Sequence, residues 1–232
     1  MSGCPDVAVL VVAKAPRPGA VKTRLAADLG DVGAARVAAA ALLDTLLVAG
    51  TVFAHRILAL SGDLADTGVI DTSALRRTVA NWQVIGQSSG DLGHRLAQAH
   101  ADAAALSPTA GGRARRILQI GMDTPQVSAG LLRDSADLLS GADVDAILGP
   151  AEDGGWWVCG TSAPAQAAAL AAVPTSRCDT GELTLAALRA VGARVGQVGP
   201  LRDLDTLDDA KVIAAEHLGL YVSAELRSQG VG

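Results

Sequence analysis

A run of cations occupies one short segment near the start of the sequence. Lys14, Arg17, Lys22 and Arg24 lie within eleven residues that also hold two prolines and a glycine, which exclude a regular helix throughout. Guanidinium and ammonium groups neutralise phosphate oxygens, and main-chain N–H groups of a loop add to them. The segment therefore predicts a polyphosphate site, with a solvated basic loop as the alternative. It is not a Walker A loop, because proline and valine replace two glycines of that pattern.

Acidic side chains follow two of the predicted strands. Asp123 comes directly after the hydrophobic run 116–121. A carboxylate there could hold Mg²⁺ or Mn²⁺ on the phosphates of a nucleotide, since magnesium takes one or two protein carboxylates plus phosphate oxygens and water. It could also cap the turn before the next helix. Asp203 and Asp205 follow a later strand, and either could complete a metal site with Asp123, whereas the polar residues of 206–209 are explained by a helix capping box.

A third polar group lies in the tight turn 149–155. Glu152 and Asp153 stand there between a proline and glycines, beside Trp156 and Trp157. Such a turn could face the hydroxyl groups of an acceptor, with the tryptophans as the wall of a pocket. A plain surface turn is the alternative.

These groups need elements that bring them together. Strands are expected at 7–13, 56–61, 83–86, 116–121, 142–148, 156–161 and 194–198. Helices are expected at 31–49, 73–80, 91–106, 128–139, 164–172 and 179–191, with a last helix that opens within 203–209 and ends near 217. The final ten residues are expected to be frayed. The alternation predicts an α/β fold with a mostly parallel sheet, in which ligands bind beyond the carboxyl ends of the strands.

Composition limits the class of protein. Half of the 232 residues are hydrophobic but only five are aromatic, so the core must consist of Ala, Val, Leu and Ile. The net charge of −5 argues against a nucleic-acid partner, which calls for a basic excess. Three cysteines without a CxxC pair favour a reducing, cytoplasmic location. The first apolar run has about seven residues, too short for a membrane span or a signal peptide. We expect one domain over residues 1–232; the oligomeric state is left open, and the four histidines are expected mostly at the surface.

Five runs of the sequence carry a resemblance to a known family. They are AKAPRPGAVKTRL (13–25), QSSGDLGHRL (87–96), GMDTP (121–125), LGPAEDGGWWVCG (148–160) and DLDTLDD (203–209). Together they resemble the bacterial selenodomain-associated transferases, which implies the GT-A fold, a three-layer sandwich with helices on both faces of a mostly parallel sheet. The segment 22–25 is also similar to the loop with which phospholactate guanylyltransferases bind a nucleoside triphosphate.

The resemblance implies a role for individual residues. Lys22 and Asp123 would be catalytic, and Asp123 and Asp205 would bind Mg²⁺ or Mn²⁺. The implied nucleotide site comprises Lys14, Arg17, Gly19, Lys22, Thr23, Arg24, Gln87, Gly90 and Asp91. The implied acceptor site comprises Glu152, Asp153, Gly154 and Gly155. Two residues depart from the family pattern, because Met122 replaces a serine and His94 replaces a glutamate.

Three functions follow from this site. Nucleotidyl transfer from a nucleoside triphosphate to a small phosphorylated acceptor is favoured, because the dense cations suit a leaving pyrophosphate. A glycosyltransferase that uses a nucleotide-sugar is the alternative on the same fold. A non-catalytic nucleotide sensor is disfavoured by the several carboxylates. The fold alone does not choose between them.

Overall fold

The computed structural model describes residues 6–107, 115–216 and 219–231. Seven strands occur within those ranges: β1 (Val7–Lys14), β2 (His55–Ser61), β3 (Gln83–Gly86), β4 (Arg116–Gly121), β5 (Ala146–Pro150), β6 (Trp156–Thr161) and β7 (Val195–Gln197). They form one sheet in the order β3-β2-β1-β4-β6-β5-β7, in which β6 runs antiparallel to both of its neighbours and the other pairings are parallel. The predicted mostly parallel α/β sheet is confirmed, and among the described strands β6 is the antiparallel one.

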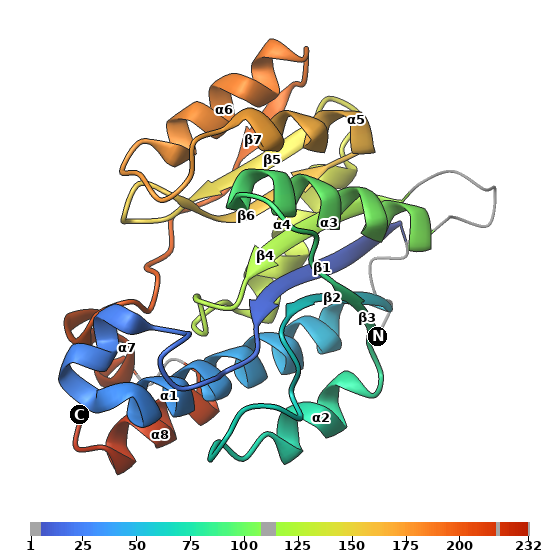
Figure 1. The fold of residues 1–232 in the computed structure, drawn as a ribbon. Helices are drawn as coiled ribbons and strands as arrows, with labels where there is room; N and C mark the ends of the chain where they lie inside the picture. Colours follow the sequence, from blue (N-terminus) through green and yellow to red (C-terminus); the bar gives the residue numbers. More distant parts are fainter. Residues whose placement is uncertain (1–5, 108–114, 217–218, 232) are drawn as a thin grey trace.

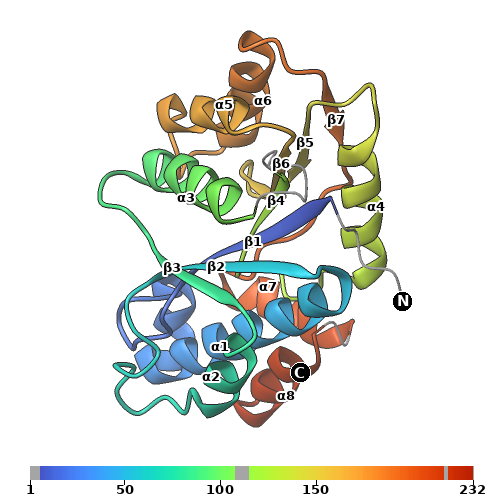
Figure 2. The same ribbon diagram turned by 90° about the vertical axis from the view of Figure 1, so that its right-hand side faces the viewer.

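The helices lie on both faces of the sheet (Figures 1 and 2). They are α1 (Thr23–Val52), α2 (Ser73–Val79), α3 (Leu92–Leu106), α4 (Ala129–Ser140), α5 (Pro164–Ala167), the 3₁₀ helix η1 (Ala168–Ala172), α6 (Thr180–Ala190), α7 (Leu207–Ala215) and α8 (Leu220–Ser228). The layered arrangement expected from the sequence is therefore present.

Strand β1 shows why the two helical layers form. Its side chains alternate between two hydrophobic clusters: Val7, Val9 and Val11 pack with α1 and α4, whereas Ala8 and Leu10 pack with α3. All five are fully buried. Because both faces of a central parallel strand are covered, its sequence is an almost continuous apolar run rather than an alternating one.

Helix α1 begins earlier and ends later than the predicted helix at 31–49. Its course is broken at Gly30, where φ is 70° and ψ is 163°, so a short first segment starts directly after Lys22. Among the described residues α1 is the one helix whose length and hydropathy would suffice to cross a membrane, and 61% of that apolar window is buried inside the fold. Its apolar side chains contact the sheet on one side and the last two helices on the other.

The end of the chain differs from the expectation. The described residues 223–231 are not frayed as expected, because α8 covers most of them and packs on α1 through Val222 and Leu226, both fully buried. The buried Asp44 of α1 accepts hydrogen bonds from the main-chain N–H groups of Tyr221 and Val222, at 3.0 and 2.8 Å. A carboxylate at the positive end of a helix satisfies donors that the helix itself leaves unpaired.

One histidine also differs from the expectation. His100 is completely buried between α3 and the sheet rather than exposed. Its Nδ1 lies 3.2 Å from Oε1 of Gln119, and its Nε2 lies 2.7 Å from Oγ1 of Thr161. Burial lowers the pKa of His100 to about 4, so the ring is neutral in the folded protein.

Candidate active site

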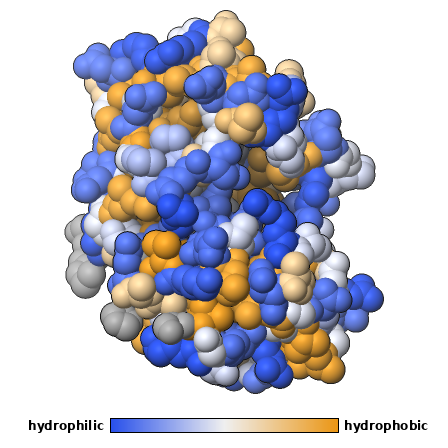
Figure 3. Space-filling model, turned by 90° about the vertical axis from the view of Figure 1, so that its left-hand side faces the viewer, coloured by the Kyte–Doolittle hydropathy of each residue, from blue (hydrophilic) through white to orange (hydrophobic). Residues whose placement is uncertain are grey.

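A cavity of about 490 Å³ opens at the carboxyl ends of β1 and β4. Figure 3 shows this side of the molecule, hollowed near its middle and bordered largely by hydrophilic side chains. The cavity brings together residues of the cationic segment (Lys14 and Lys22), the run 87–96 (Gln87) and the two acidic loops (Asp123 and Asp205). The strand-end rule for parallel sheets accounts for its position.

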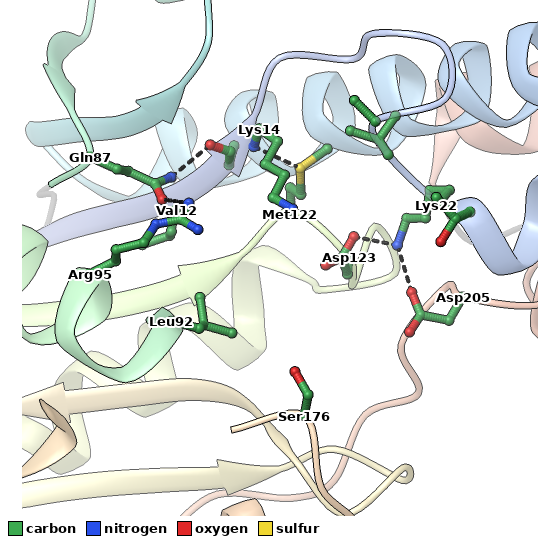
Figure 4. A pocket seen from close by; sticks show the side chains of 14 residues that line it. Val12, Lys14, Lys22, Gln87, Leu92, Arg95, Met122, Asp123, Ser176 and Asp205 are labelled. Atoms are coloured by element: carbon green, nitrogen blue, oxygen red, sulfur yellow. Dashed lines mark hydrogen bonds and ion pairs between the residues drawn. The ribbon is translucent and has the colours of Figure 1, made fainter. Parts of the chain in front are cut away.

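Lys22 lies at one end of the cavity, between Asp123 and Asp205 (Figure 4). Its ammonium forms ion pairs with Asp123 and with Asp205, the latter at 3.0 Å from Oδ1. The side chain is only 4% exposed, and its main chain has the left-handed φ of 50° where α1 begins. Burial by itself would lower the pKa of Lys22, but the two carboxylates outweigh it and the pKa is raised. Lys22 therefore carries its charge in the folded protein.

Two loops hold these carboxylates side by side. The main-chain N–H of Leu204 donates a hydrogen bond of 2.8 Å to the main-chain carbonyl oxygen of Asp123. The predicted capping box is present after it, because Thr206 accepts from the N–H of Asp209 and the Asp209 carboxylate accepts from the N–H of Thr206 at 2.8 Å. The loop that carries Asp205 is thus attached to the loop after β4 at one end and to α7 at the other.

Asp203 adds a third acid to this end of the site. Burial, together with the charges of Asp123, Asp153 and Asp205, raises the pKa of Asp203 to about 8. At neutral pH this side chain is predominantly the protonated acid. Acidic side chains outnumber the Lys22 ammonium at this end of the site, so a further cation would be stabilised there.

These residues fit a divalent cation as a two-ligand site. Oxygen atoms of Asp123 and Asp205 already converge on a single cation, the Lys22 ammonium. No cluster of three or more His, Cys, Asp or Glu side chains with metal-binding geometry occurs among the residues that the structure describes. Two carboxylates are the usual protein share for Mg²⁺ on a nucleotide, because phosphate oxygens and water complete its shell. Metal binding would require the Lys22 ammonium to move off the shared position.

The other predicted cations are dispersed. Lys14 lines the cavity, as does the predicted nucleotide-binding residue Thr23. Arg17 is exposed and lies 3.7 Å from Asp66, outside the cavity. Arg24 is exposed too, at 3.9 Å from Oδ2 of Asp205. Gly19, the remaining predicted residue of this loop, has a φ of +75° and supports the turn rather than lining the cavity.

The run 87–96 is built around the start of α3. Asp91 is the N-cap, and its carboxylate accepts from the N–H of His94 at 2.8 Å. Gly90 makes the preceding turn with a φ of +113°. Neither Gly90 nor Asp91 lines the cavity, whereas Gln87 does. The exposed His94, which departs from the family pattern, is likewise outside the lining.

The other departure, Met122, has a structural role. It is buried, and its sulfur accepts a hydrogen bond of 3.3 Å from the main-chain N–H of Lys14. A thioether is a weak acceptor, so the methionine retains a contact between the ends of β1 and β4 without the hydroxyl of serine.

The predicted acceptor turn borders a second, adjoining cavity of about 560 Å³, which is lined by Asp153, Gly155 and Trp156 and shares Lys14, Asp123 and Asp205 with the first. The other two predicted residues of the turn, Glu152 and Gly154, do not line this cavity.

Glu152 forms an ion pair with Arg202. Gly154 is required by packing: its φ is +91°, and a Cβ there would lie 1.9 Å from the carbonyl oxygen of Cys178. Its own carbonyl oxygen accepts from the N–H of Gly181 at 2.8 Å. The turn is thereby attached to the first turn of α6 and packs on the loop before it.

The loop before α6 and the first residue of that helix supply cavity residues that the sequence did not indicate. Ser176 lines both cavities and has a left-handed φ of 60°, and Arg177 and Thr180 line the second cavity. Arg95 lines the first. Arg95 stands within the run 87–96, so its position was available from the sequence; nothing local marks Ser176, because its approach to the cavity depends on the packing of α6.

Comparisons with known proteins agree with this fold. The profile of a bacterial family described as "Uncharacterized protein conserved in bacteria (DUF2064)" matches residues 34–177, which include three of the five runs noted in the sequence. The comparison with curated proteins gives no significant match.

Several solved structures are similar in fold, among them two that are described as transferases. A proposed nucleotide-diphospho-sugar transferase from Desulfovibrio desulfuricans G20 matches 97% of this chain and 95% of its own, with 23% identity and a TM-score of 0.79. A cytidylyltransferase from Leptospira borgpetersenii matches 96% and 93%, with 11% identity and a TM-score of 0.54. Rv0371c from Mycobacterium tuberculosis H37Rv, in complex with manganese, matches 90% and 97%, with 21% identity and a TM-score of 0.50. At these identities the likeness establishes the fold that nucleotidyltransferases share.

Proposed function

The chain belongs to the DUF2064 family, and from that premise we propose that it is a metal-dependent transferase that moves the nucleotidyl group of a nucleoside triphosphate to a small phosphorylated acceptor. The observation that carries the proposal is the convergence of Asp123 and Asp205 on one cation in a cavity at the strand ends. The resemblance to selenodomain-associated transferases and the nucleotidyltransferase fold of the neighbours support it. A nucleotide donor also agrees with the predicted cytoplasmic location.

Asp123 and Asp205 would hold Mg²⁺ or Mn²⁺. When bound, the metal ion supplies positive charge that stabilises the negative charge developing on the phosphate oxygens. A related structure contains manganese, which is a property of that protein and supports the same metal class here.

The lysine side chains of the cavity would bind the pyrophosphate that leaves. In the proposed reaction an oxygen of the acceptor phosphate bonds to the α-phosphorus, the bond from that phosphorus to the bridging oxygen of the β-phosphate breaks, and pyrophosphate leaves. Lys22, once displaced from the carboxylates, and Lys14 on the same cavity wall would bind the departing charge. The protein mainly positions the groups and stabilises charge, as phosphoryl transfer requires.

The acceptor would lie in the adjoining cavity of about 560 Å³. Asp153 and Trp156 border it, and its shared wall with the first cavity includes both proposed metal ligands. An acceptor there would have direct access to the nucleotide phosphates.

Glycosyl transfer from a nucleotide-sugar is the second candidate. The observation in its favour is the TM-score of 0.79 with a structure described as a proposed nucleotide-diphospho-sugar transferase. Here the acceptor attacks the sugar carbon and a nucleoside diphosphate leaves, so no pyrophosphate forms.

A binding experiment tests both candidates. Thermal unfolding is measured with each nucleoside triphosphate and with a set of nucleotide-sugars, with and without Mg²⁺ or Mn²⁺. A ligand that binds only the folded state adds about 2.7 kcal/mol of stability at a hundredfold excess over its Kd. We expect a metal-dependent rise with at least one triphosphate. A rise with nucleotide-sugars alone would favour glycosyl transfer, and no rise with any nucleotide would overturn the transferase proposal.

A further inference from the structure

Arg95 lies in the same cavity as Lys22, at the opposite end (Figure 4). It belongs to the first turns of α3, and one of its terminal nitrogens donates a hydrogen bond to Oε1 of Gln87. Gln87 in turn donates from its amide nitrogen to the carbonyl oxygens of Ala13 and Ala59, both at 2.8 Å. Both amide hydrogens are used by the ends of β1 and β2, so the amide oxygen is held toward Arg95. Gln87 therefore positions the guanidinium group.

The guanidinium has capacity for a ligand. Within the part of the chain that the structure describes, Gln87 is its one side-chain partner, and no carboxylate pairs with it. A guanidinium group has five N–H donors, so about four remain for other acceptors. Arg177, Arg194 and Arg202, by contrast, each pair with an acidic side chain. Arg95 is thus a donor fork at the wall of a cavity, with Gln87 but no carboxylate as a partner among the described residues.

The surroundings of Arg95 suit a flat ring more than a phosphate group. Val12 and Leu92 lie beside it in the cavity, and Leu92 is 38% exposed although it is a large apolar residue. The carboxylates that would hold a phosphate-bound metal ion lie at the other end, around Lys22. A nucleotide placed with its phosphates at that end has its base near Val12, Leu92 and Arg95. Apolar contact with the ring faces and a few convergent donors at its edge are what binding sites for planar ligands provide.

We propose that Arg95 selects the nucleobase, and that it favours guanine or cytosine over adenine and uracil; this inference rests on the proposed nucleotide-binding function. A guanidinium fork donates two parallel hydrogen bonds and therefore matches two adjacent acceptors. Guanine presents O6 and N7 in this way, and cytosine presents O2 and N3. In adenine the amino group, a donor, stands next to both N1 and N7. In uracil the N3–H, also a donor, stands between O2 and O4. Neither base therefore accepts both hydrogen bonds of the fork. Gln87, with its hydrogens used by the strands, contributes no donor of its own to the base.

The test measures the affinities of GTP, CTP, ATP and UTP by calorimetry, each with Mg²⁺, on the parent protein and on Arg95→Lys. Lysine keeps the charge but lacks the planar fork. A good bidentate contact to a base discriminates by about 1–3 kcal/mol, so GTP or CTP should bind the parent about fivefold or more tightly than ATP and UTP. In Arg95→Lys this ratio should fall to within about threefold, while metal-dependent binding persists. Arg189→Lys, on the exposed face of α6, is the matched control and should keep the parent ratio.

The outcomes separate this inference from the function on which it rests. Equal affinities for the four nucleotides, a preference for ATP or UTP, or an unchanged ratio in Arg95→Lys would each overturn base selection by Arg95 and leave the nucleotide-binding proposal intact. Absence of binding of all four to the parent would overturn the proposed function and this inference together. Arg95→Gln, which keeps an N–H donor but neither the charge nor the fork, provides a second variant if the lysine variant melts at a lower temperature than the parent.

Discussion

The main-chain N–H of Leu204 donates a hydrogen bond of 2.8 Å to the main-chain carbonyl oxygen of Asp123. The bond joins two loops from distant parts of the sequence and brings the carboxylates of Asp123 and Asp205 to the same ammonium group of Lys22. Because the contact is between main-chain atoms, the pairing of the two acids does not depend on either side chain. Each acid can therefore be replaced while the loops stay in place.

Asp123→Asn should abolish the metal-dependent part of nucleotide binding. The amide keeps the shape of the side chain but removes the charge that a divalent cation requires. Without metal, unfolding free energy should fall by only about 1 kcal/mol, since the partly exposed pair is weakened and Lys22 retains Asp205. Urea unfolding with and without Mg²⁺ and nucleotide checks both parts. Asp208→Asn, on an exposed side chain of α7, is the control, and equal metal responses in the two variants would contradict a metal role for Asp123.

Lys22→Met should lower stability in the absence of metal and increase the stabilisation by Mn²⁺ alone. Removal of the buried ammonium leaves two carboxylates without their shared counter-ion, and loss of one partner of a buried pair costs about 3–5 kcal/mol, which the partial exposure of the acids reduces here. A metal ion can then enter without displacing lysine. Melting temperatures across a Mn²⁺ titration measure the effect. Lys211→Met, from an exposed pair with Asp208, should change neither value. A smaller Mn²⁺ response in Lys22→Met than in the parent would show that lysine does not compete with the metal.

Gly154→Ala should be far more destabilising than Gly192→Ala. Both glycines have a positive φ, which alone costs alanine about 1–2 kcal/mol. At Gly192 no atom lies within 4 Å of an added Cβ, so this backbone cost is the whole effect. At Gly154 the Cβ would lie 1.9 Å from the carbonyl oxygen of Cys178, so the acceptor turn must separate from the loop before α6. Chemical unfolding of the two variants provides the comparison, and similar losses would show that the turn adapts without cost.

Stability should fall between about pH 6.5 and pH 4 through His100. Its folded pKa of about 4 lies below the ordinary 6.5, so in this window the unfolded chain binds a proton that the native state does not. The contribution is fully present above pH 6.5 and is lost progressively as the pH falls toward 4, to a total of about 3 kcal/mol. Urea unfolding of the parent and of His100→Gln across this range isolates the effect from that of the carboxylates. Parallel pH profiles of the two proteins would contradict it.

Much of the fold was predictable because its signals are local. The strands at Gln83–Gly86, Arg116–Gly121 and Trp156–Thr161 have the predicted bounds, since apolar runs between turn residues are sufficient to define them. The N-cap Ser128 and the capping box at Thr206 were also recognisable, because each involves residues three positions apart. The fraying predicted for the last residues was wrong because α8 is stabilised by burial against α1, a contact that no local pattern contains.

The site residues also separate into those that local sequence signals placed and those that only the tertiary structure placed. The sequence by itself placed Lys14, Asp123 and Asp205 at the ends of strands or in the loops after them, because parallel strands direct their carboxyl ends to one edge. Only the tertiary structure decided that Lys22 pairs with both acids, that Arg17 points elsewhere and that Arg95 faces the cavity without a carboxylate partner among the described residues. A side chain's partner depends on distances between elements far apart in the chain: Lys22 and Asp205 are 183 positions apart, and only the tertiary structure brings their side chains to 3.0 Å.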